Sequence, residues 1–187
     1  MKLNIGAGYT KYPDFLTVDH DPLTNPDYLA DLENLKLPIE DNQVEGIIAH
    51  HVFEHIGPGF FPLLQELYRV CKHGAILDIK VPHHRSECYY GDPSHIRPIT
   101  VDMMKLFSKK YNHWHMEQFN SSSGFGIKLN VDFEIVDFKY APYDKWKERF
   151  ESMSNEEIDE VVMNFNNVFW ETSIMMMVIK DESSNNS

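Results

Sequence analysis

The architecture of this 187-residue chain follows from residues 2–19, which read KLNIGAGYTKYPDFLTVD. This stretch predicts a short apolar strand over Lys2–Ile5, a turn of small residues, and a second apolar strand over Leu16–Val18 that ends at Asp19. In open α/β sheets, a strand, a turn with almost no side chains and an acid that closes the next strand commonly bind the ribose of a nucleoside. Glycine suits such a turn because a ligand approaches the backbone closely only where no Cβ intervenes. We therefore expect a nucleoside site here, with an ordinary strand–turn–strand as the alternative.

The composition indicates one globular domain. The length allows one domain with a sizeable hydrophobic core and is too short for two domains of ordinary size. A hydrophobic content of 42% fits a globular protein. We expect a single domain over residues 1–180 and a disordered polar tail over residues 181–187. No apolar run reaches about 18 residues, so neither a membrane span nor a signal peptide is expected. Cys71 and Cys88 are too few for a disulfide framework, which favours a cytoplasmic location.

The charge restricts the class of partner. The formal net charge is −12, from 17 basic and 29 acidic residues. Such a surface repels phosphate backbones and anionic membranes. We therefore expect a small-molecule substrate and neither a nucleic-acid nor a membrane partner. The oligomeric state does not follow from the sequence.

Apolar patterning predicts seven strands and three main helices. The strands cover residues 2–5, 16–18, 28–30, 46–50, 75–81, 133–140 and 173–179. One helix is expected over about residues 60–72, where apolar residues recur at 4-3-4 spacing, with Gly74 as its stop. Thr100 can cap a second helix, and Ser154 with Glu157 forms a capping box that opens a third, to about Asn166. Residues 51–56 are expected to form a helical turn, and residues 82–98 and 121–126 loops.

The connections between strands predict the fold class. A parallel crossover needs a dozen or more residues, and the links between the first three strands are shorter than that or marginal. The sequence therefore predicts an α/β fold, a Rossmann-like doubly wound and mostly parallel seven-stranded sheet whose helices are trimmed in the N-terminal half. A dinucleotide site would need G-x-G-x-x-G and a helix N-terminus for the pyrophosphate. Lys11 stands at the third glycine, and no helix fits between Gly8 and Leu16, which argues against a dinucleotide.

Several motifs, in order along the chain, resemble those of one family. They are Gly6-Ala7-Gly8, Val18-Asp19, Asp31-Leu32 before Pro38, HVFEH at residues 51–55 and GDPSHIRPIT at residues 91–100. Over nearly its whole length the chain resembles the class I S-adenosylmethionine-dependent methyltransferases. It looks closest to small bacterial and phage members with HVxEH and DPxHxR elements. The resemblance implies an enzyme whose cofactor is S-adenosyl-L-methionine.

The same resemblance implies a role for each matched position. The glycine turn, Gly6–Gly8, would pass under the methionine and ribose parts of the cofactor. Asp19 would bind the ribose hydroxyls, Asp31 would accept a hydrogen bond from the adenine amino group, and Leu32 would pack beside the ring. His50 would line the methionine part. S-adenosylmethionine carries no phosphate, so the missing helix after the glycine turn is compatible with this cofactor, although the standard methyltransferase keeps that helix.

Three interpretations stay open for the HVFEH histidines. His51, Glu54 and His55 would share one face of a helix. A metal site is the first interpretation, but the motif is not HExxH and no third ligand can be identified, so we predict no bound metal. The second is that Glu54 and His55 tie the loop after the fourth strand to its neighbours. The third is a direct catalytic role at the methyl acceptor.

A methyl acceptor that reacts through oxygen must lose a proton, and histidine titrates in the useful range. The preferred base is His95 in the Asp92–His95 loop, oriented by Asp92, and the alternative for this loop is a rigid turn. The candidate catalytic residues are His95, Asp92, His51 and His55, and the candidate substrate-binding residues are Arg97 and His84.

The sequence therefore predicts a methyltransferase for a small acceptor, at an oxygen of a sugar or surface-polysaccharide precursor. The acceptor class rests on the resemblance alone. Two alternatives stay open: methylation of a protein side chain or nucleobase, and a non-catalytic cofactor-binding or interaction protein of the same fold.

Overall fold

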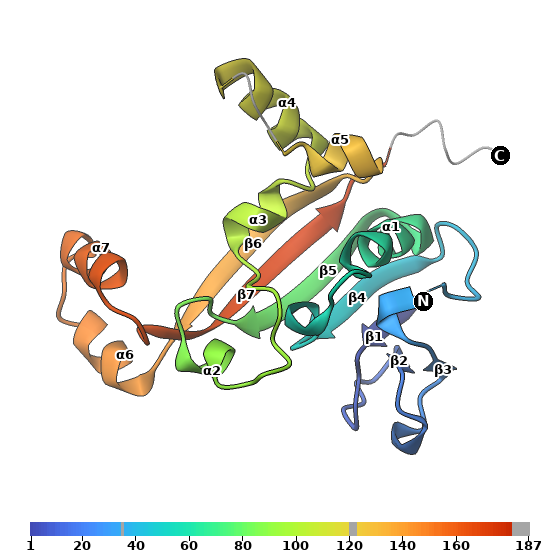
Figure 1. Cartoon of the computed structure of the whole chain (residues 1–187), viewed down its shortest axis with the longest axis horizontal. Coiled ribbons are helices and arrows are strands. Elements are labelled where there is room, and N and C mark those ends of the chain that lie inside the picture. Colours follow the sequence, from blue (N-terminus) through green and yellow to red (C-terminus); the bar gives the residue numbers. More distant parts are fainter. Residues whose placement is uncertain (35, 120–122, 181–187) are drawn as a thin grey trace.

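The computed structural model describes residues 1–34, 36–119 and 123–180, which build one seven-stranded sheet (Figure 1). The strand order is β3-β2-β1-β4-β5-β7-β6, in which the first five strands run parallel and β7 runs antiparallel to both β5 and β6. The predicted α/β fold with a mostly parallel sheet is confirmed. The strands are β1 (Lys2–Ile5), β2 (Phe15–Asp19), β3 (Tyr28–Leu29), β4 (Val44–His50), β5 (Cys71–Pro82), β6 (Phe133–Pro142) and β7 (Phe169–Val178).

The helices are concentrated in the second half of the chain. Among the described residues before β4, the connections contain only two short 3-10 turns, as the link lengths predicted. The 3-10 turns are η1 (Pro22–Thr24), η2 (Leu32–Asn34) and η3 (Phe53–His55). The α-helices are α1 (Phe60–Val70), α2 (Glu87–Tyr90), α3 (Val101–Lys105), α4 (Lys109–Phe119), α5 (Phe125–Leu129), α6 (Asp144–Phe150) and α7 (Asn155–Asn164).

Helix α1 lies over β4 and β5 (Figure 1) and buries the expected apolar stripe, including Leu64 and Leu67. The helix ends at Val70, earlier than predicted, because Cys71 already begins β5 and pairs with Val44. The prediction that Gly74 stops the helix is wrong. Gly74 lies inside β5 with a φ of +79°, where the register between β4 and β5 shifts.

Other predicted segments differ in ways that have a local cause. Both caps are present: the Thr100 hydroxyl accepts from the Met103 amide, and the Ser154–Glu157 capping box opens α7. Helices α4 and α6 were not predicted. The expected loop at residues 82–98 contains α2, which Ser86 caps. Residues 121–122 of the other expected loop and the expected disordered tail, residues 181–187, lie outside the described residues.

The core lies mainly on one face of the sheet. In β5, Leu77, Ile79 and Val81 are fully buried, whereas the alternating Asp78 and Lys80 are half-buried. This alternation is what a sheet with one packed face produces. The trimming of the N-terminal helices leaves the carboxyl ends of β1, β2 and β4 bordered by loops and 3-10 turns.

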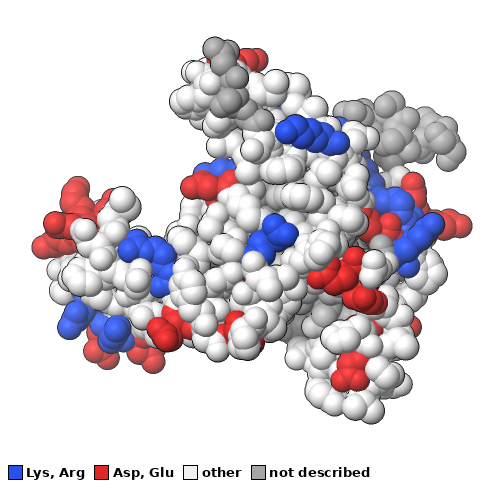
Figure 2. Space-filling model, in the orientation of Figure 1, with Lys and Arg blue, Asp and Glu red and all other residues white. Residues whose placement is uncertain are grey.

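No helix of the described residues is long and apolar enough to cross a membrane. On the face shown in Figure 2, basic side chains lie in separate groups among acidic ones. This face therefore offers no continuous basic track of the kind that follows a nucleic-acid backbone.

Candidate functional site

A pocket of about 570 Å³ lies at the carboxyl ends of β1, β2 and β4. In the strand order, β1 stands between β2 and β4, so the pocket occupies the point where the direction of winding reverses. Open α/β sheets bind their ligands at this switch point. The lining residues are Gly6, Gly8, Tyr9, Asp19, His20, Asp21, Thr24, Asp31, Leu32, Glu33, His51, Val52, His55 and Ile56.

The glycine turn has the backbone conformation that the sequence suggested. Gly6 and Gly8 have φ values of +60° and +53°, which side chains disfavour. A Cβ on Gly6 would also stand 2.5 Å from Val52 Cγ2. Ala7 is buried in the core instead and does not line the pocket. The turn thus presents backbone and no side chain at Gly6 and Gly8.

The Asp19 carboxylate is only 5% exposed and forms the floor of the turn. Its Oδ2 accepts from the Gly8 amide at 2.7 Å, and its Oδ1 accepts from the Asp21 amide at 2.9 Å. Each carboxylate oxygen has two lone pairs, so both can still accept from a ligand hydroxyl. Asp19 therefore fixes the glycine turn and keeps acceptor capacity toward the pocket.

Asp31 and Leu32 also line the pocket, where η2 begins. Asp31 Oδ1 accepts from the Glu33 amide at 2.9 Å, and Leu32 is buried. Glu33 then bridges to the next connection, because its carboxylate accepts from the amides of Gly57 at 2.5 Å and Gly59 at 2.7 Å. No spacing pattern in the sequence predicts this Glu33 bridge, which holds together two segments that border the pocket.

His50 does not line this pocket. Its Nε2 lies 3.1 Å from Asp78 Oδ2 on the neighbouring strand, and its ring contacts Tyr12 edge-on at 6.3 Å. Its role beside the methionine part of the cofactor stays a prediction.

His51 lines the pocket and lies between two carboxylates. Its Nε2 is 3.1 Å from Glu171 Oε2, and its Nδ1 is 3.5 Å from Glu54 Oε1. Glu54 raises the pKa of His51; partial burial opposes this effect, and Glu171 adds to it. Both ring nitrogens thus face carboxylate oxygens, and Nε2 is close enough to donate a hydrogen bond to Glu171.

His55 lines the pocket, and His95 lies directly beside it, with ring centroids 4.7 Å apart. His55 Nδ1 is 3.0 Å from Ser94 Oγ, which in turn donates to Asp92 Oδ1 at 2.5 Å. The Ser94 amide also donates to Asp92 Oδ1, at 2.8 Å. The two hydrogen bonds from Ser94 lower the pKa of Asp92. His95 Nδ1 is 2.8 Å from the Tyr89 carbonyl oxygen, and His95 Nε2 is 3.8 Å from Asp92 Oδ2. The structure therefore brings together His55, His95 and Asp92, which come from two distant segments.

The loop that carries His95 is docked on η3 through the backbone. The amides of Ile96 and Arg97 both donate to the Glu54 carbonyl oxygen, at 2.9 and 3.2 Å. The Arg97 guanidinium donates to the Gly57 carbonyl oxygen at 3.1 Å and lies over the Phe60 ring at 4.6 Å. Arg97 and His84 do not line the pocket, so the structure does not bring these two candidate substrate-binding residues to it.

His83 and His84 form a separate pair just past β5, with ring centroids 4.4 Å apart. His83 is 6% exposed, and its burial, together with the charges of His84 and Arg85, lowers its pKa to about 4. Burial and Arg85 also lower the pKa of His84. Both rings are therefore neutral at physiological pH.

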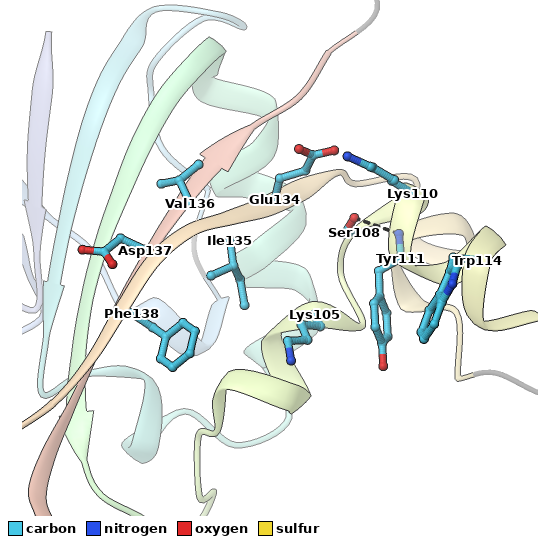
Figure 3. A pocket seen from close by; sticks show the side chains of 10 residues that line it. All are labelled: Lys105, Ser108, Lys110, Tyr111, Trp114, Glu134, Ile135, Val136, Asp137 and Phe138. Atoms are coloured by element: carbon cyan, nitrogen blue, oxygen red, sulfur yellow. Dashed lines mark hydrogen bonds between the residues drawn. The ribbon is translucent and has the colours of Figure 1, made fainter. Parts of the chain in front are cut away.

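A second pocket, of about 590 Å³, lies between β6 and the α3–α4 region (Figure 3). Figure 3 shows Tyr111 and Trp114 of α4 on one side and Ile135 and Phe138 of β6 on the other. None of the site residues predicted from the sequence lines this pocket.

Comparison with known proteins relates part of the chain to a known domain family. Residues 8–79, which run from the glycine turn into β5, match the family model of the methyltransferase domain. Over these residues the chain is similar to methyltransferase domains. The match supports the prediction of a methyltransferase that uses S-adenosyl-L-methionine. No curated protein matches the sequence.

Solved structures show the same fold at low sequence identity. A methyltransferase from Archaeoglobus fulgidus is 18% identical, with a TM-score of 0.61, over 94% of this chain and 85% of that one. The [4+2]-cyclase SpnF is 12% identical, with a TM-score of 0.57, over 96% and 75%. The 1,6-didemethyltoxoflavin-N1-methyltransferase of Burkholderia thailandensis, with bound S-adenosylhomocysteine, is 10% identical, with a TM-score of 0.54, over 96% and 71%. Since the fold also occurs in a cyclase, the acceptor chemistry must be argued from the site.

The pocket at the switch point fits S-adenosylmethionine. Gly6 and Gly8 expose backbone where a Cβ would be strained or would clash, and the carboxylates of Asp19 and Asp31 line the same cavity as Leu32. The cofactor carries hydroxyls and an amino group that donate hydrogen bonds, and no phosphate that would need a helix N-terminus. Its polar groups and those of the pocket are complementary.

Proposed function

We propose that this methyltransferase, with residues 1–180 acting as one domain, methylates an oxygen of a small hydroxylated acceptor, a sugar or a surface-polysaccharide precursor. The observation that carries the proposal is a single pocket in which two glycines and two aspartates adjoin His51 and His55. The first set suits a nucleoside cofactor, and the second suits an acceptor that must lose a proton.

The cofactor supplies a methyl group on a positively charged sulfur. Asp19 accepts from the ribose hydroxyls, Asp31 accepts from the adenine amino group, and Leu32 packs against the ring. Gly6 and Gly8 let the ligand approach the backbone. Because displacement at carbon is in line, most of the acceleration comes from holding donor and acceptor aligned.

The acceptor lies at the histidine end of the pocket. His55 Nε2 has no hydrogen bond within the described ranges, so it can receive the acceptor proton, and Ser94 and Asp92 hold the ring through Nδ1. His95 stands behind His55, and Asp92 is the residue that orients both. His51 donates to the acceptor or holds the Glu171 side of the pocket.

The acceptor class follows from charge. Four carboxylates line the pocket, at Asp19, Asp21, Asp31 and Glu33. An anionic acceptor such as a nucleic-acid backbone is repelled by them, whereas the hydroxyls of a neutral sugar can donate to carboxylate oxygens. The net charge of −12 acts in the same direction.

Isothermal titration with S-adenosylmethionine and S-adenosylhomocysteine tests the cofactor half. We expect binding to the wild type and a loss of at least about tenfold in Asp19→Ala. Asp27→Ala is the matched control, because Asp27 also holds a backbone amide, that of Thr17 at 2.8 Å, but does not line the pocket. No binding to the wild type at millimolar ligand contradicts the proposal.

Transfer of a labelled methyl group tests the acceptor half. The panel contains free and nucleotide-linked sugars, peptides and oligonucleotides. We expect incorporation into sugars and loss of turnover in His55→Ala. Incorporation only into peptides or oligonucleotides would replace the proposed acceptor class.

A further inference from the structure

The Glu54 carboxylate is a buried group that faces His51 but that no hydrogen bond satisfies within the described ranges. The side chain is fully buried, and neither Oε1 nor Oε2 has a hydrogen-bond partner within the described ranges. His51 Nδ1 lies 3.5 Å from Oε1, which is too long for a good hydrogen bond. A buried carboxylate without partners is costly, so such a group calls for a cation or a proton.

Two imidazoles face this carboxylate. One ligand atom each from Glu54, His55 and His95 lies within 4.8 Å of the other two. The tautomers follow from the hydrogen bonds. His95 Nδ1 faces the Tyr89 carbonyl oxygen, which only accepts, so Nδ1 carries the hydrogen and Nε2 keeps its lone pair.

The same argument applies to His55. The Ser94 hydroxyl donates to Asp92, so it accepts from His55 Nδ1, and His55 Nε2 also keeps its lone pair. Metal-binding histidines almost always donate their second ring nitrogen to a carbonyl, a carboxylate or a similar acceptor. In both histidines Nδ1 is therefore hydrogen-bonded, and Nε2 has a lone pair available for a metal ion.

We propose that Glu54, His55 and His95 bind one divalent transition-metal ion at the acceptor end of the pocket. Two imidazole nitrogens and one carboxylate oxygen suit Zn²⁺ and its first-row neighbours, whereas Mg²⁺ and Ca²⁺ prefer oxygen alone. Ligands of a tetrahedral ion, with bonds of about 2.0–2.1 Å, lie about 3.3 Å apart, so the three side chains close by at most about 1.5 Å on binding. The fourth position stays free for water or substrate.

The backbone already brings the ligands together. The Ile96 and Arg97 amides donate to the Glu54 carbonyl oxygen, which fixes the loop of His95 against the segment that carries Glu54 and His55. This long-range docking supplies the third ligand that the sequence could not identify, and it departs from the expectation of no metal.

The function of the ion rests on the proposed methyl transfer to oxygen. Because His55 lines the pocket, an ion bound there faces the acceptor. A metal-bound hydroxyl ionises near neutral pH, so the ion would generate the nucleophilic oxygen that a free histidine base otherwise has to produce.

Metal binding is measured without the cofactor. Tag-free protein is stripped with a chelator and titrated with ZnCl₂ by calorimetry, and elemental analysis follows equilibrium dialysis. We expect one Zn²⁺ per chain, no binding of MgCl₂, and at least about a hundredfold weaker Zn²⁺ binding in His55→Ala and His95→Ala. His113→Ala, which removes an exposed histidine of α4, should bind like the wild type.

Glu54→Gln separates ligation from folding. The substitution keeps the shape and removes the buried charge, so the metal-free variant should be at least as stable as the metal-free wild type. Zn²⁺ should raise the melting temperature of the wild type and not that of Glu54→Gln. The proposal fails if Zn²⁺ binds the wild type, Glu54→Gln and His95→Ala equally, or does not bind at all. If S-adenosylhomocysteine binds and Zn²⁺ does not, the metal site alone is refuted; the reverse result refutes the proposed function.

Discussion

Two pockets of this protein, the one at the switch point and the one beside β6, have nearly equal volumes, about 570 and 590 Å³, and quite different walls. Both volumes are typical of small-molecule sites. The first pocket combines backbone at two glycines with four carboxylates and histidines, at the switch point of the parallel sheet. The second lies against the edge strand β6 and is lined by aromatic rings and lysines (Figure 3). The two pockets differ in the backbone conformation of their lining residues and in their position on the sheet, and not in size.

The difference has a structural origin. The first pocket exists because the described residues of the connections after β1, β2 and β3 form no α-helix, so loops and 3-10 turns with special backbone angles surround the strand ends. The second lies against side chains such as Val136 and Phe138, about half exposed on β6, a strand that pairs on one side only. A nucleoside needs acceptors and close backbone, and these occur together only in the first pocket.

The largest expected effect is that of Gly6→Ala. The new Cβ stands 2.5 Å from Val52 Cγ2 at a φ of +60°, so we expect a loss of about 2–4 kcal/mol in the free energy of unfolding and of measurable S-adenosylhomocysteine binding. Gly8→Ala is the control: it has no heavy atom within 4 Å and should cost only about 1–2 kcal/mol of backbone strain. Urea unfolding and calorimetry measure both. Equal losses of stability in the two variants would show that the contact with Val52 is not what requires glycine at position 6.

The next effect is a loss of folding stability in acid that depends on His83. Because His83 lines neither of the two pockets, the effect should not distinguish them. Its pKa is about 4 in the folded protein and about 6.5 when unfolded, so the unfolded state binds the proton first. Stability present above pH 6.5 should fall as the pH drops toward 4, by at most about 3 kcal/mol. His83→Asn should lose less over this range, and His113→Asn should follow the wild type. Comparing the change with pH removes any constant offset between variants, and parallel curves for wild type and His83→Asn would contradict the assignment.

The smallest effect compares one residue from each pocket. Asp31→Ser keeps a cap for η2 but shortens the side chain, so we expect about tenfold weaker S-adenosylhomocysteine binding and little change in stability. Trp114→Ala in the second pocket should leave the affinity unchanged. A loss of affinity in Trp114→Ala and none in Asp31→Ser would assign the cofactor to the pocket of Figure 3.

The sequence was most informative where the signal is local. The strand at Lys2–Ile5, the glycine turn and the capping box at Ser154 all depend on residues within a few positions of one another, and each is present. Helix α4 was missed because its large apolar side chains, such as Trp114 and Phe119, are exposed and give no buried stripe.

Long-range contacts explain what the sequence could not predict about the site. His95 approaches His55 only because the loop 91–97 docks on the Glu54 carbonyl, a contact between segments about 40 residues apart with no periodic signal. The complete burial of Glu54 likewise depends on that docking. The family resemblance suggested His50 and the motif at residues 91–100 suggested Arg97; the structure shows His50 beside Asp78 and Arg97 on the Gly57 carbonyl oxygen, and neither residue lines the pocket.

The Glu33 bridge has a consequence for how the pocket opens. The Gly57 and Gly59 amides donate to the Glu33 carboxylate and not to a carbonyl oxygen of a helix or sheet. We therefore expect their amide hydrogens to exchange with solvent only when turn η2 moves away. A Cβ at Gly59 would stand 2.2 Å from the Glu33 carbonyl oxygen, so the two segments also touch through their backbones. We therefore expect a ligand that holds η2 through Asp31 to slow hydrogen exchange at both glycines, so that the two segments would open together.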